Sequence, residues 1–212
     1  MNKKKSLISP KYTNLNLLTE EEKKNIKREI PWEHYVLDDF IEYKALKRMQ
    51  KTLLSKKHNF SIQEGDVNQV QFTLLRYLPL ARIFYSIEFK SLLERFSNTS
   101  LSLNTSNYVQ LRYMSPEAPA FPIHVDDLGF KSLVVVYYFS PDWVEGAGGE
   151  VCLYNNEFED ESQALAIKPI ENRLFFFFSD DTNWHSIRKV NNWDRYTILS
   201  EWIVKKQNKV NA

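Results

Sequence analysis

Three residues in the C-terminal half of the chain have the types and spacing of a metal site. His124 and Asp126 are two residues apart in the segment FPIHVDD, and His185 lies further along the chain in the segment DTNWHSI. Two histidines and one carboxylate can occupy one face of an octahedral ion and leave other positions open, a set typical of non-haem Fe(II) oxygenases. These residues therefore predict an iron centre.

A fixed positive charge lies just beyond the second histidine. Arg195 follows His185 by ten positions, and its planar guanidinium suits a carboxylate better than any other side chain does. Taken singly, each of the chain's four histidines, His34, His58, His124 and His185, is better explained as structural. An isolated His-x-Asp is weak evidence too, so the prediction rests on the combination of these features in a segment rich in strand patterns.

The elements that would position these residues are strands. From Tyr108 onward the chain consists of short β-branched and aromatic runs divided by turn residues: YVQLRYM, SLVVVYYF, EVCLYN, ALAIKPI, RLFFFF, HSIRKV and RYTILSEWI. This series without helical periodicity predicts a jelly-roll or cupin-like double sheet. Alternate side chains of a strand share one face, so His124 and Asp126 would both point into the barrel. Gly148 and Gly149 predict a turn or bulge, and Leu174–Phe178 predicts a strand buried on both faces.

The first hundred residues are expected to be mainly helical. Thr19 and Glu22 form a capping-box pattern for a helix through about Glu29. The other expected elements are a strand at Tyr35–Leu37, a helix from Phe40 to about Lys56 capped by Asp38 or Asp39, helices at Val67–Leu78 and Ile87–Phe96, and a polar connection with a short strand at Ser97–Asn107. The predicted class is therefore α+β, with a double-stranded β-helix core and N-terminal supporting helices.

The chain is expected to form a single domain over residues 1–212. Residues 1–18 would be a flexible leader, residues 19–100 mainly helical support, and residues 108–204 the β-core with the active site. A net charge of +1 argues against a nucleic-acid or membrane-surface binder, and no apolar run approaches the ~20 residues that span a bilayer. The single cysteine, Cys152, excludes an intrachain disulfide and fits a reducing compartment, which favours the cytoplasm.

Several blocks of sequence carry a resemblance to a known family. They are HVDD, VVVYYFSPDW, the GGE of Gly148–Glu150, RLFFFFSD, the DRYTI after the distal histidine, and YVLDDF before the long helix. With these blocks the chain resembles the 2-oxoglutarate and Fe(II)-dependent oxygenases, and within them the prolyl-4-hydroxylase-like branch. The resemblance covers Tyr35–Val204 in layout and is close over Tyr108–Trp202.

This resemblance implies roles for particular residues. His124, Asp126 and His185 would bind Fe(II), and Arg195 would bind the distal carboxylate of the co-substrate 2-oxoglutarate. The further co-substrate contacts that it implies are Tyr138, Thr197 and Tyr113. The implied reaction is a dioxygenase reaction, hydroxylation with release of succinate and CO2, and ascorbate is an auxiliary reductant to be considered. Asp126 favours hydroxylation, because halogenating relatives have a small residue at that position.

The substrate is the least defined part of the prediction. A prolyl residue, a free amino acid or an amino-acid-derived small molecule would each suit the resemblance. Arg112, Trp184 and Arg188 are candidate substrate contacts, although strand alternation places Arg112 opposite Tyr113, so a surface salt bridge explains Arg112 equally well. The alternative function is a non-catalytic metal- or 2-oxoglutarate-binding protein of the same fold, of the sensor or cupin type.

Overall fold

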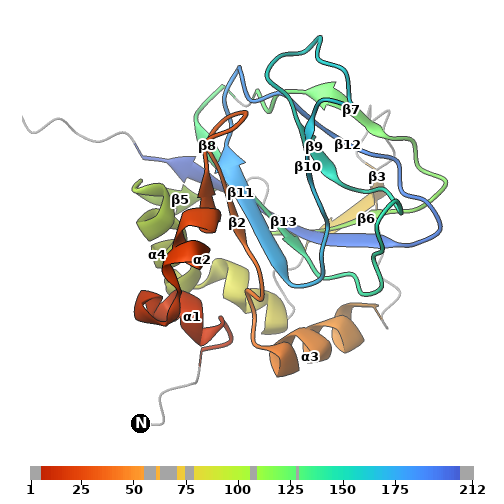
Figure 1. Ribbon diagram of the computed structural model, residues 1–212. Coiled ribbons are helices and arrows are strands. Elements are labelled where there is room, and N and C mark those ends of the chain that lie inside the picture. The colour runs from red at the N-terminus through yellow and green to blue at the C-terminus, as the bar shows by residue number, and fades with distance from the viewer. Residues whose placement is uncertain are drawn as a thin grey trace, which may run out of the picture.

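The computed structural model describes residues 6–54, 61–62, 71–74, 79–105, 109–127 and 129–205. Two antiparallel sheets face each other in this part of the chain, and the helices lie on the outer side of the larger sheet (Figure 1). The larger sheet has the order β1-β2-β11-β8-β13-β6-β4-β3, with β5 paired to β13, and the smaller has the order β10-β9-β12-β7. The predicted α+β class with a double-stranded β-helix core is confirmed.

The strands of the larger sheet are β1 (Lys27–Arg28), β2 (His34–Leu37), β3 (Ser61–Ile62), β4 (Gln71–Leu74), β5 (Leu101–Leu103), β6 (Gln110–Met114), β8 (Ser132–Tyr138), β11 (Arg173–Phe178) and β13 (Arg195–Val204). The strands of the smaller sheet are β7 (Phe121–His124), β9 (Val151–Leu153), β10 (Leu165–Ile167) and β12 (His185–Ile187). The long central strands β8, β11 and β13 of the larger sheet thus form a continuous floor beneath the smaller sheet.

The helices are α1 (Pro10–Thr13), η1 (Leu15–Leu17), α2 (Glu20–Ile26), α3 (Tyr43–Leu54), η2 (Pro79–Tyr85) and α4 (Ile87–Ser97). Side-chain caps mark the starts of α2 and α4. The predicted capping box is present at α2, where the Glu22 amide donates to the Thr19 hydroxyl at 3.1 Å and the Thr19 amide donates to Glu22 at 2.8 Å. The Ser86 hydroxyl caps α4 by accepting from the Phe89 amide. Since such caps satisfy orphan N–H groups, these helix starts are readable from sequence.

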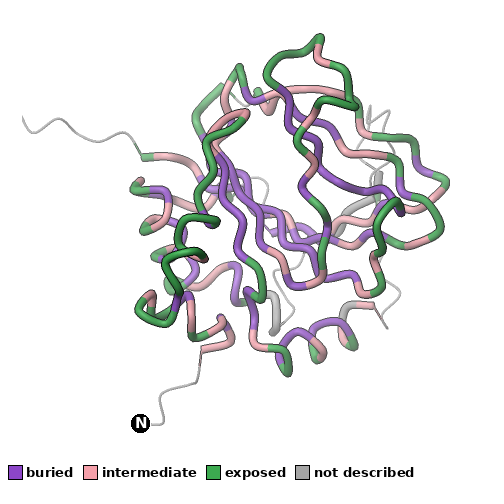
Figure 2. The backbone as a smooth tube through the Cα atoms, in the orientation of Figure 1, coloured by how far each residue is buried: buried purple, intermediate pink, exposed green. Residues whose placement is uncertain are grey.

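The aromatic strand β11 divides the core into two layers. Leu174 and Phe176 pack with the helices, whereas Phe175 and Phe177 face the smaller sheet. All four of these side chains are buried, and Figure 2 shows the buried backbone concentrated in the central strands. The predicted strand with two buried faces is confirmed. Consequently one face of the larger sheet holds the helices, and the other is available to line a site.

The expectation of a flexible leader is wrong for residues 6–18. Ile8 forms a β-bridge with Ile41, the Tyr12 hydroxyl donates to the Asp38 carbonyl at 2.5 Å, and Leu18 is buried with both. These apolar residues are separated by polar ones, so the sequence shows no periodic face, yet each occupies a place in the core under the helices. Residues 1–5 lie outside the described part of the chain.

Three predicted helix boundaries are also corrected. The predicted helix Val67–Leu78 is wrong for residues 71–74, which form β4 and pair with β6, and its other residues lie outside the described ones. Sheet pairing here overrides local propensity. The helix predicted through Glu29 ends at Ile26, because β1 follows and pairs with β2. Asp38 binds Arg173 and Asp39 has a φ of +54°, so neither caps α3.

No helix within the described ranges is both long and apolar enough to cross a membrane.

A buried histidine in β2 gives the fold a pH dependence. His34 is fully buried against Trp32 and Phe175, its Nε2 has no hydrogen-bond partner in the described part of the chain, and burial lowers its pKa. Below the ordinary histidine pKa of about 6.5, the unfolded chain therefore binds a proton at His34 and the folded chain does not. The free energy of unfolding then falls by up to about 1.4 kcal/mol per pH unit until the pKa of the folded state is reached. Stability is thus fully present above about pH 6.5 and falls on acidification.

We expect His34→Phe to remove part of this dependence. Urea unfolding at pH 7.5 and pH 5.5 should show the wild type losing about 1 kcal/mol more free energy of unfolding than the variant. Equal losses in the two proteins would show that His34 does not contribute.

Candidate metal centre and its pocket

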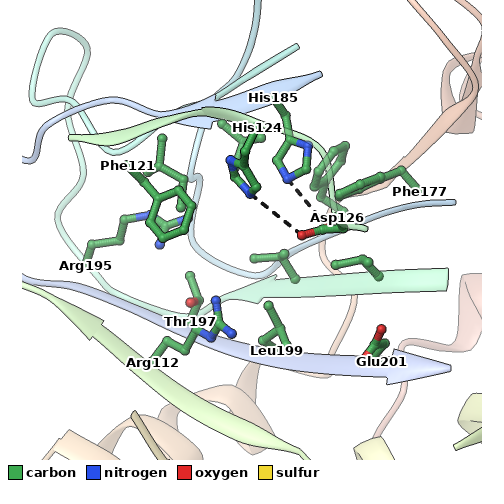
Figure 3. Close-up of a pocket in the computed structure, with 15 residues that line it drawn as sticks. Arg112, Phe121, His124, Asp126, Phe177, His185, Arg195, Thr197, Leu199 and Glu201 are labelled. Atoms are coloured by element: carbon green, nitrogen blue, oxygen red, sulfur yellow. Dashed lines mark ion pairs between the residues drawn. The ribbon is translucent and has the colours of Figure 1, made fainter. Parts of the chain in front are cut away.

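Pairing of two short strands brings the two predicted histidine ligands together. His124 ends β7 and His185 begins β12, and they are direct cross-strand partners with ring centroids 4.2 Å apart. Asp126 follows β7, with its Oδ1 3.7 Å from Nε2 of His124 and its Oδ2 3.6 Å from Nε2 of His185. One ligand atom from each residue lies within 4.8 Å of the others. Figure 3 shows the three side chains pointing toward one another. The structure therefore assembles the predicted set.

The hydrogen bonds behind the histidines fix which nitrogen faces this cluster. Nδ1 of His124 lies 2.9 Å from the Pro122 carbonyl, and Nδ1 of His185 lies 2.9 Å from the Asn183 carbonyl. A carbonyl oxygen only accepts, so each Nδ1 carries the proton and each Nε2 presents its lone pair to Asp126 and the opposite ring. Metal-binding histidines characteristically have such outer partners, and this donor set suits a divalent ion such as Fe(II).

The protonation states of two of these groups favour a metal. Burial opposes ionisation of Asp126, but the neighbouring histidines and Arg112 outweigh it and hold the pKa of Asp126 below its ordinary value. Burial also lowers the pKa of His185, against the opposing charge of Asp126. An ionised carboxylate and a neutral imidazole are the forms that bind a cation, so little proton release is needed at these two ligands at neutral pH.

The cluster faces a cavity of about 230 Å³ between the two sheets. The smaller sheet and the segment after β7 supply the His124–Asp126–His185 cluster, and the larger sheet supplies the opposite wall (Figure 3). The apolar side chains that line the cavity are Phe121, Val134, Val136, Val151, Phe175, Phe177, Ile187 and Leu199. The polar ones besides the cluster are Arg112, Arg195, Thr197 and Glu201. Such a largely apolar cavity with a few convergent polar groups is typical of a small-molecule site.

Arg195 is buried in this cavity without a carboxylate partner among the described residues. It is 4% exposed, its Nε donates to the Gly149 carbonyl at 2.9 Å, and its guanidinium lies 5.4 Å from the Tyr138 ring centroid. Burial lowers the pKa of Arg195 and raises that of Tyr138, whose hydroxyl has no hydrogen-bond partner in the described chain. The buried Glu150 acts on the charge of Arg195 from a distance but makes no ion pair with it among the described residues. A buried cation without a direct ion pair is costly, so Arg195 and Tyr138 indicate an anionic ligand.

A glycine pair holds the turn behind Arg195. Gly148 and Gly149 have φ values of +75° and +81°, which side-chain-bearing residues rarely adopt. A Cβ at Gly148 would lie 1.9 Å from the Lys189 carbonyl oxygen, and one at Gly149 would lie 3.0 Å from Cδ of Arg195. The assigned turn lies just before this pair, at 145–146, rather than at the pair itself. Close approach of a main-chain oxygen explains Gly148, and close approach of the Trp193 and Arg195 side chains explains Gly149.

We expect Gly148→Ala to destabilise the fold by about 3 kcal/mol, because it combines backbone strain with overlap against a main-chain atom. Gly146 offers a matched control, since it has a φ of +84° but an added Cβ would meet nothing within 4 Å. Gly146→Ala should therefore cost only about 1 kcal/mol of strain. Thermal or urea unfolding of the two variants measures the difference, and equal losses would refute the role of the close contact.

Comparison with known families identifies the β-core. Residues 109–204 match the model of the 2OG-Fe(II) oxygenase superfamily, and this segment contains the whole His124–Asp126–His185 cluster together with Arg195. The β-core belongs to the 2OG-Fe(II) oxygenase superfamily. A comparison of the sequence with curated proteins finds no match.

Solved structures share the fold of this chain. A prolyl hydroxylase from Trichoplax adhaerens, in complex with a hypoxia inducible factor oxygen degradation domain peptide fragment, has a TM-score of 0.63 at 20% identity over 91% of this chain and 90% of that one. A prolyl 4-hydroxylase from Phytophthora capsici has a TM-score of 0.65 at 22% identity over 98% of this chain and 69% of that one. The likeness is therefore to the prolyl-4-hydroxylase type of fold.

One predicted co-substrate residue lies outside the oxygenase cavity. Tyr113 shares its face of β6 with Leu111 in the core, stacks on Tyr196 at 4.8 Å, and its hydroxyl donates to Asp194 at 2.9 Å. The structure thus places Tyr113 on the face of β6 that points away from the cavity, and its role as a co-substrate contact stays a prediction. The register of β6 against β13 points Arg112 inward instead, so Arg112 lines the cavity.

The remaining predicted residues divide clearly. Tyr138 and Thr197 are buried on the cavity side of the larger sheet. Arg188 donates to Glu161 at 2.7 Å, and neither Arg188 nor Trp184 lines the cavity. Sequence reasoning missed Glu201, which lines the cavity. The period of two along β13 from Arg195 through Thr197 was the signal that could have found it.

Proposed function

We propose that the protein is an Fe(II)- and 2-oxoglutarate-dependent dioxygenase that hydroxylates an unactivated C–H bond and releases succinate and CO2. The substrate class is a prolyl residue, a free amino acid or an amino-acid-derived small molecule. The observation that carries the proposal is that a two-histidine, one-carboxylate cluster and a buried arginine without an ion partner in the described chain face one cavity. The whole chain would act as a single oxygenase domain.

His124, Asp126 and His185 would hold the metal through Nε2 of each histidine and the Asp126 carboxylate. Their backbone hydrogen bonds keep both rings in the required tautomer without any rearrangement. When bound, Fe(II) with 2-oxoglutarate and O2 supplies the oxidising chemistry that an unactivated C–H bond requires.

Arg195 would bind the distal carboxylate of 2-oxoglutarate, assisted by the hydroxyls of Tyr138 and Thr197. The Gly149 carbonyl fixes the guanidinium, so little side-chain entropy is lost when the carboxylate binds. Phe175 and Val136 line the same cavity. These apolar walls exclude water, which strengthens the ion pair relative to one in solvent.

The substrate would approach from the side of His124 and Asp126. Their side chains are 29% and 27% exposed, whereas that of His185 is 8% exposed. The cavity thus opens at the first two ligands and is closed at the third. A cytoplasmic location and the absence of nucleic-acid and membrane partners stay predictions from composition.

Uncoupled turnover tests the proposal. Purified protein with Fe(II), ascorbate as reductant and 2-oxoglutarate should release succinate slowly in air even without the primary substrate. Wild-type protein that neither releases succinate nor gains thermal stability from 2-oxoglutarate would contradict the proposal. Stabilisation by 2-oxoglutarate without turnover across a substrate panel would instead favour a sensor of the same fold.

A further inference from the structure

A second guanidinium shares the cavity with Arg195. Arg112 lies in β6 and is the cross-strand partner of Thr197 in β13. Because alternate residues of a strand share a face, Arg195 and Thr197 point to the cavity together, and Arg112 joins them there. Figure 3 shows Arg112 rising from the larger sheet into the space below Phe121 and the histidines.

The two guanidinium groups differ in depth. Arg195 is almost fully buried and anchored to the Gly149 carbonyl, whereas Arg112 is half-buried. Nε of Arg112 donates to Oε1 of Gln110 at 3.0 Å, which orients the planar group. A guanidinium carries five N–H donors, so Arg112 can bind an anion while it keeps this bond.

Two carboxylates line the cavity among the described residues, and each has partners of its own. Asp126 lies between the two histidines. Glu201 accepts from the Ser132 hydroxyl at 3.0 Å and from the Asn104 amide at 2.7 Å, and Figure 3 shows it at the far end of the larger sheet's wall from Arg112. Arg195, Thr197 and Arg112 thus line one part of the cavity wall, and Glu201 lines another.

We propose that the primary substrate carries a carboxylate and that Arg112 binds it. This inference rests on the proposed function, in which 2-oxoglutarate places its distal carboxylate on the deeper Arg195. The shallower guanidinium then meets the molecule that enters second, and a two-point bond to a carboxylate fixes its orientation toward the metal cluster. A free amino acid or a peptide C-terminus has such a group, whereas an internal prolyl residue in a neutral peptide does not.

Acid and amide pairs separate these cases. Protein loaded anaerobically with Fe(II) and 2-oxoglutarate is titrated by calorimetry with L-amino acids including L-proline, with their amides, and with the dipeptide Gly-Pro in free and amidated form. We expect at least one free acid to bind about tenfold or more tightly than its amide. Preference for free amino acids over Gly-Pro would identify a small-molecule substrate, and the reverse a peptide terminus; either supports the proposal.

Variants of Arg112 test whether this side chain causes the preference for the acid over the amide. Arg112→Gln should abolish the difference between acid and amide while the Kd for 2-oxoglutarate stays unchanged, and Arg112→Lys should retain part of it because charge remains without the planar fork. Arg48→Gln is the control, since Arg48 is exposed on α3. It should behave as the wild type.

Two outcomes would overturn this inference and leave the proposed function standing. One is that no acid in the panel binds more tightly than its amide to wild-type protein that does bind Fe(II) and 2-oxoglutarate. The other is that Arg112→Gln weakens 2-oxoglutarate itself, which would assign Arg112 to the co-substrate. Wild-type protein that fails to bind Fe(II) and 2-oxoglutarate at all would overturn the proposed function, and this inference with it.

Discussion

Replacing His124 with alanine is expected to lower Fe(II) affinity at least about 100-fold and to abolish succinate release. The variant keeps only His185 and Asp126, which are two of the three ligands needed to occupy one face of an octahedral ion. Loss of a residue that hydrogen-bonds to a ligand typically lowers metal affinity about 10- to 100-fold, and loss of a ligand itself should lower it further. Anaerobic calorimetry with Fe(II) gives the affinity, and succinate quantification gives the turnover. His124 is partly exposed at the end of β7, so its truncation removes no core packing, and a melting curve of the variant checks that it folds.

A second histidine inside the barrel provides the matched control. His34 is buried in the larger sheet but does not line the cavity. His34→Phe should therefore bind Fe(II) as the wild type does and alter only the pH dependence of stability. Unchanged Fe(II) affinity in His124→Ala, or an equal loss in both variants, would contradict the assignment of the metal ligands.

Replacing Arg195 with glutamine is expected to raise the Kd for 2-oxoglutarate at least about 100-fold. Two charge-assisted hydrogen bonds contribute about 1.5–3 kcal/mol each, and a tenfold change in Kd corresponds to about 1.4 kcal/mol. Fe(II) affinity without co-substrate should be nearly unchanged, because the contacts of Arg195 are to Gly149 and Tyr138 rather than to the metal ligands. Titration of 2-oxoglutarate into Fe(II)-loaded protein measures the effect.

Two further variants test whether the loss of 2-oxoglutarate affinity is specific to the guanidinium of Arg195. Arg195→Lys keeps the charge but not the planar fork, so it should recover only part of the affinity. Arg48→Gln removes an arginine from the surface of α3 and should leave the Kd unchanged. A normal Kd for 2-oxoglutarate in Arg195→Gln would refute its role, and a normal melting curve for that variant would show that the loss is not one of folding.

The metal ligands were predictable because their chemistry is local. His-x-Asp has a spacing that a short extended segment converts into one shared face, and His185 and Arg195 lie at the starts of two readable strands. The cross-strand pairing of His185 with His124 was not predictable, since register between strands distant in sequence is set by the packing of the whole barrel. Sequence therefore names the candidate ligands, and only the fold shows that they lie together.

The differences between expected and observed positions come from the same source. A one-residue shift in register exchanges the two faces of a strand, and this is why Arg112 rather than Tyr113 faces the cavity. The alternation of side chains was read correctly, but the inward face of β6 depends on its pairing with β13. Ile8 and Tyr12 were missed because each makes a long-range contact, to Ile41 and Asp38, that leaves no periodic pattern.

An anaerobic titration of the wild-type protein with Fe(II) and 2-oxoglutarate tests the central claim most directly. If His124, Asp126, His185 and Arg195 form one site, 2-oxoglutarate will bind with one-to-one stoichiometry in the presence of Fe(II), and its affinity will be much lower without Fe(II). The mixture with Fe(II) will also develop the weak visible absorption of an Fe(II) chelate. The absorption will be absent in His124→Ala. Binding of 2-oxoglutarate that is indifferent to Fe(II), or no binding in its presence, would contradict the account.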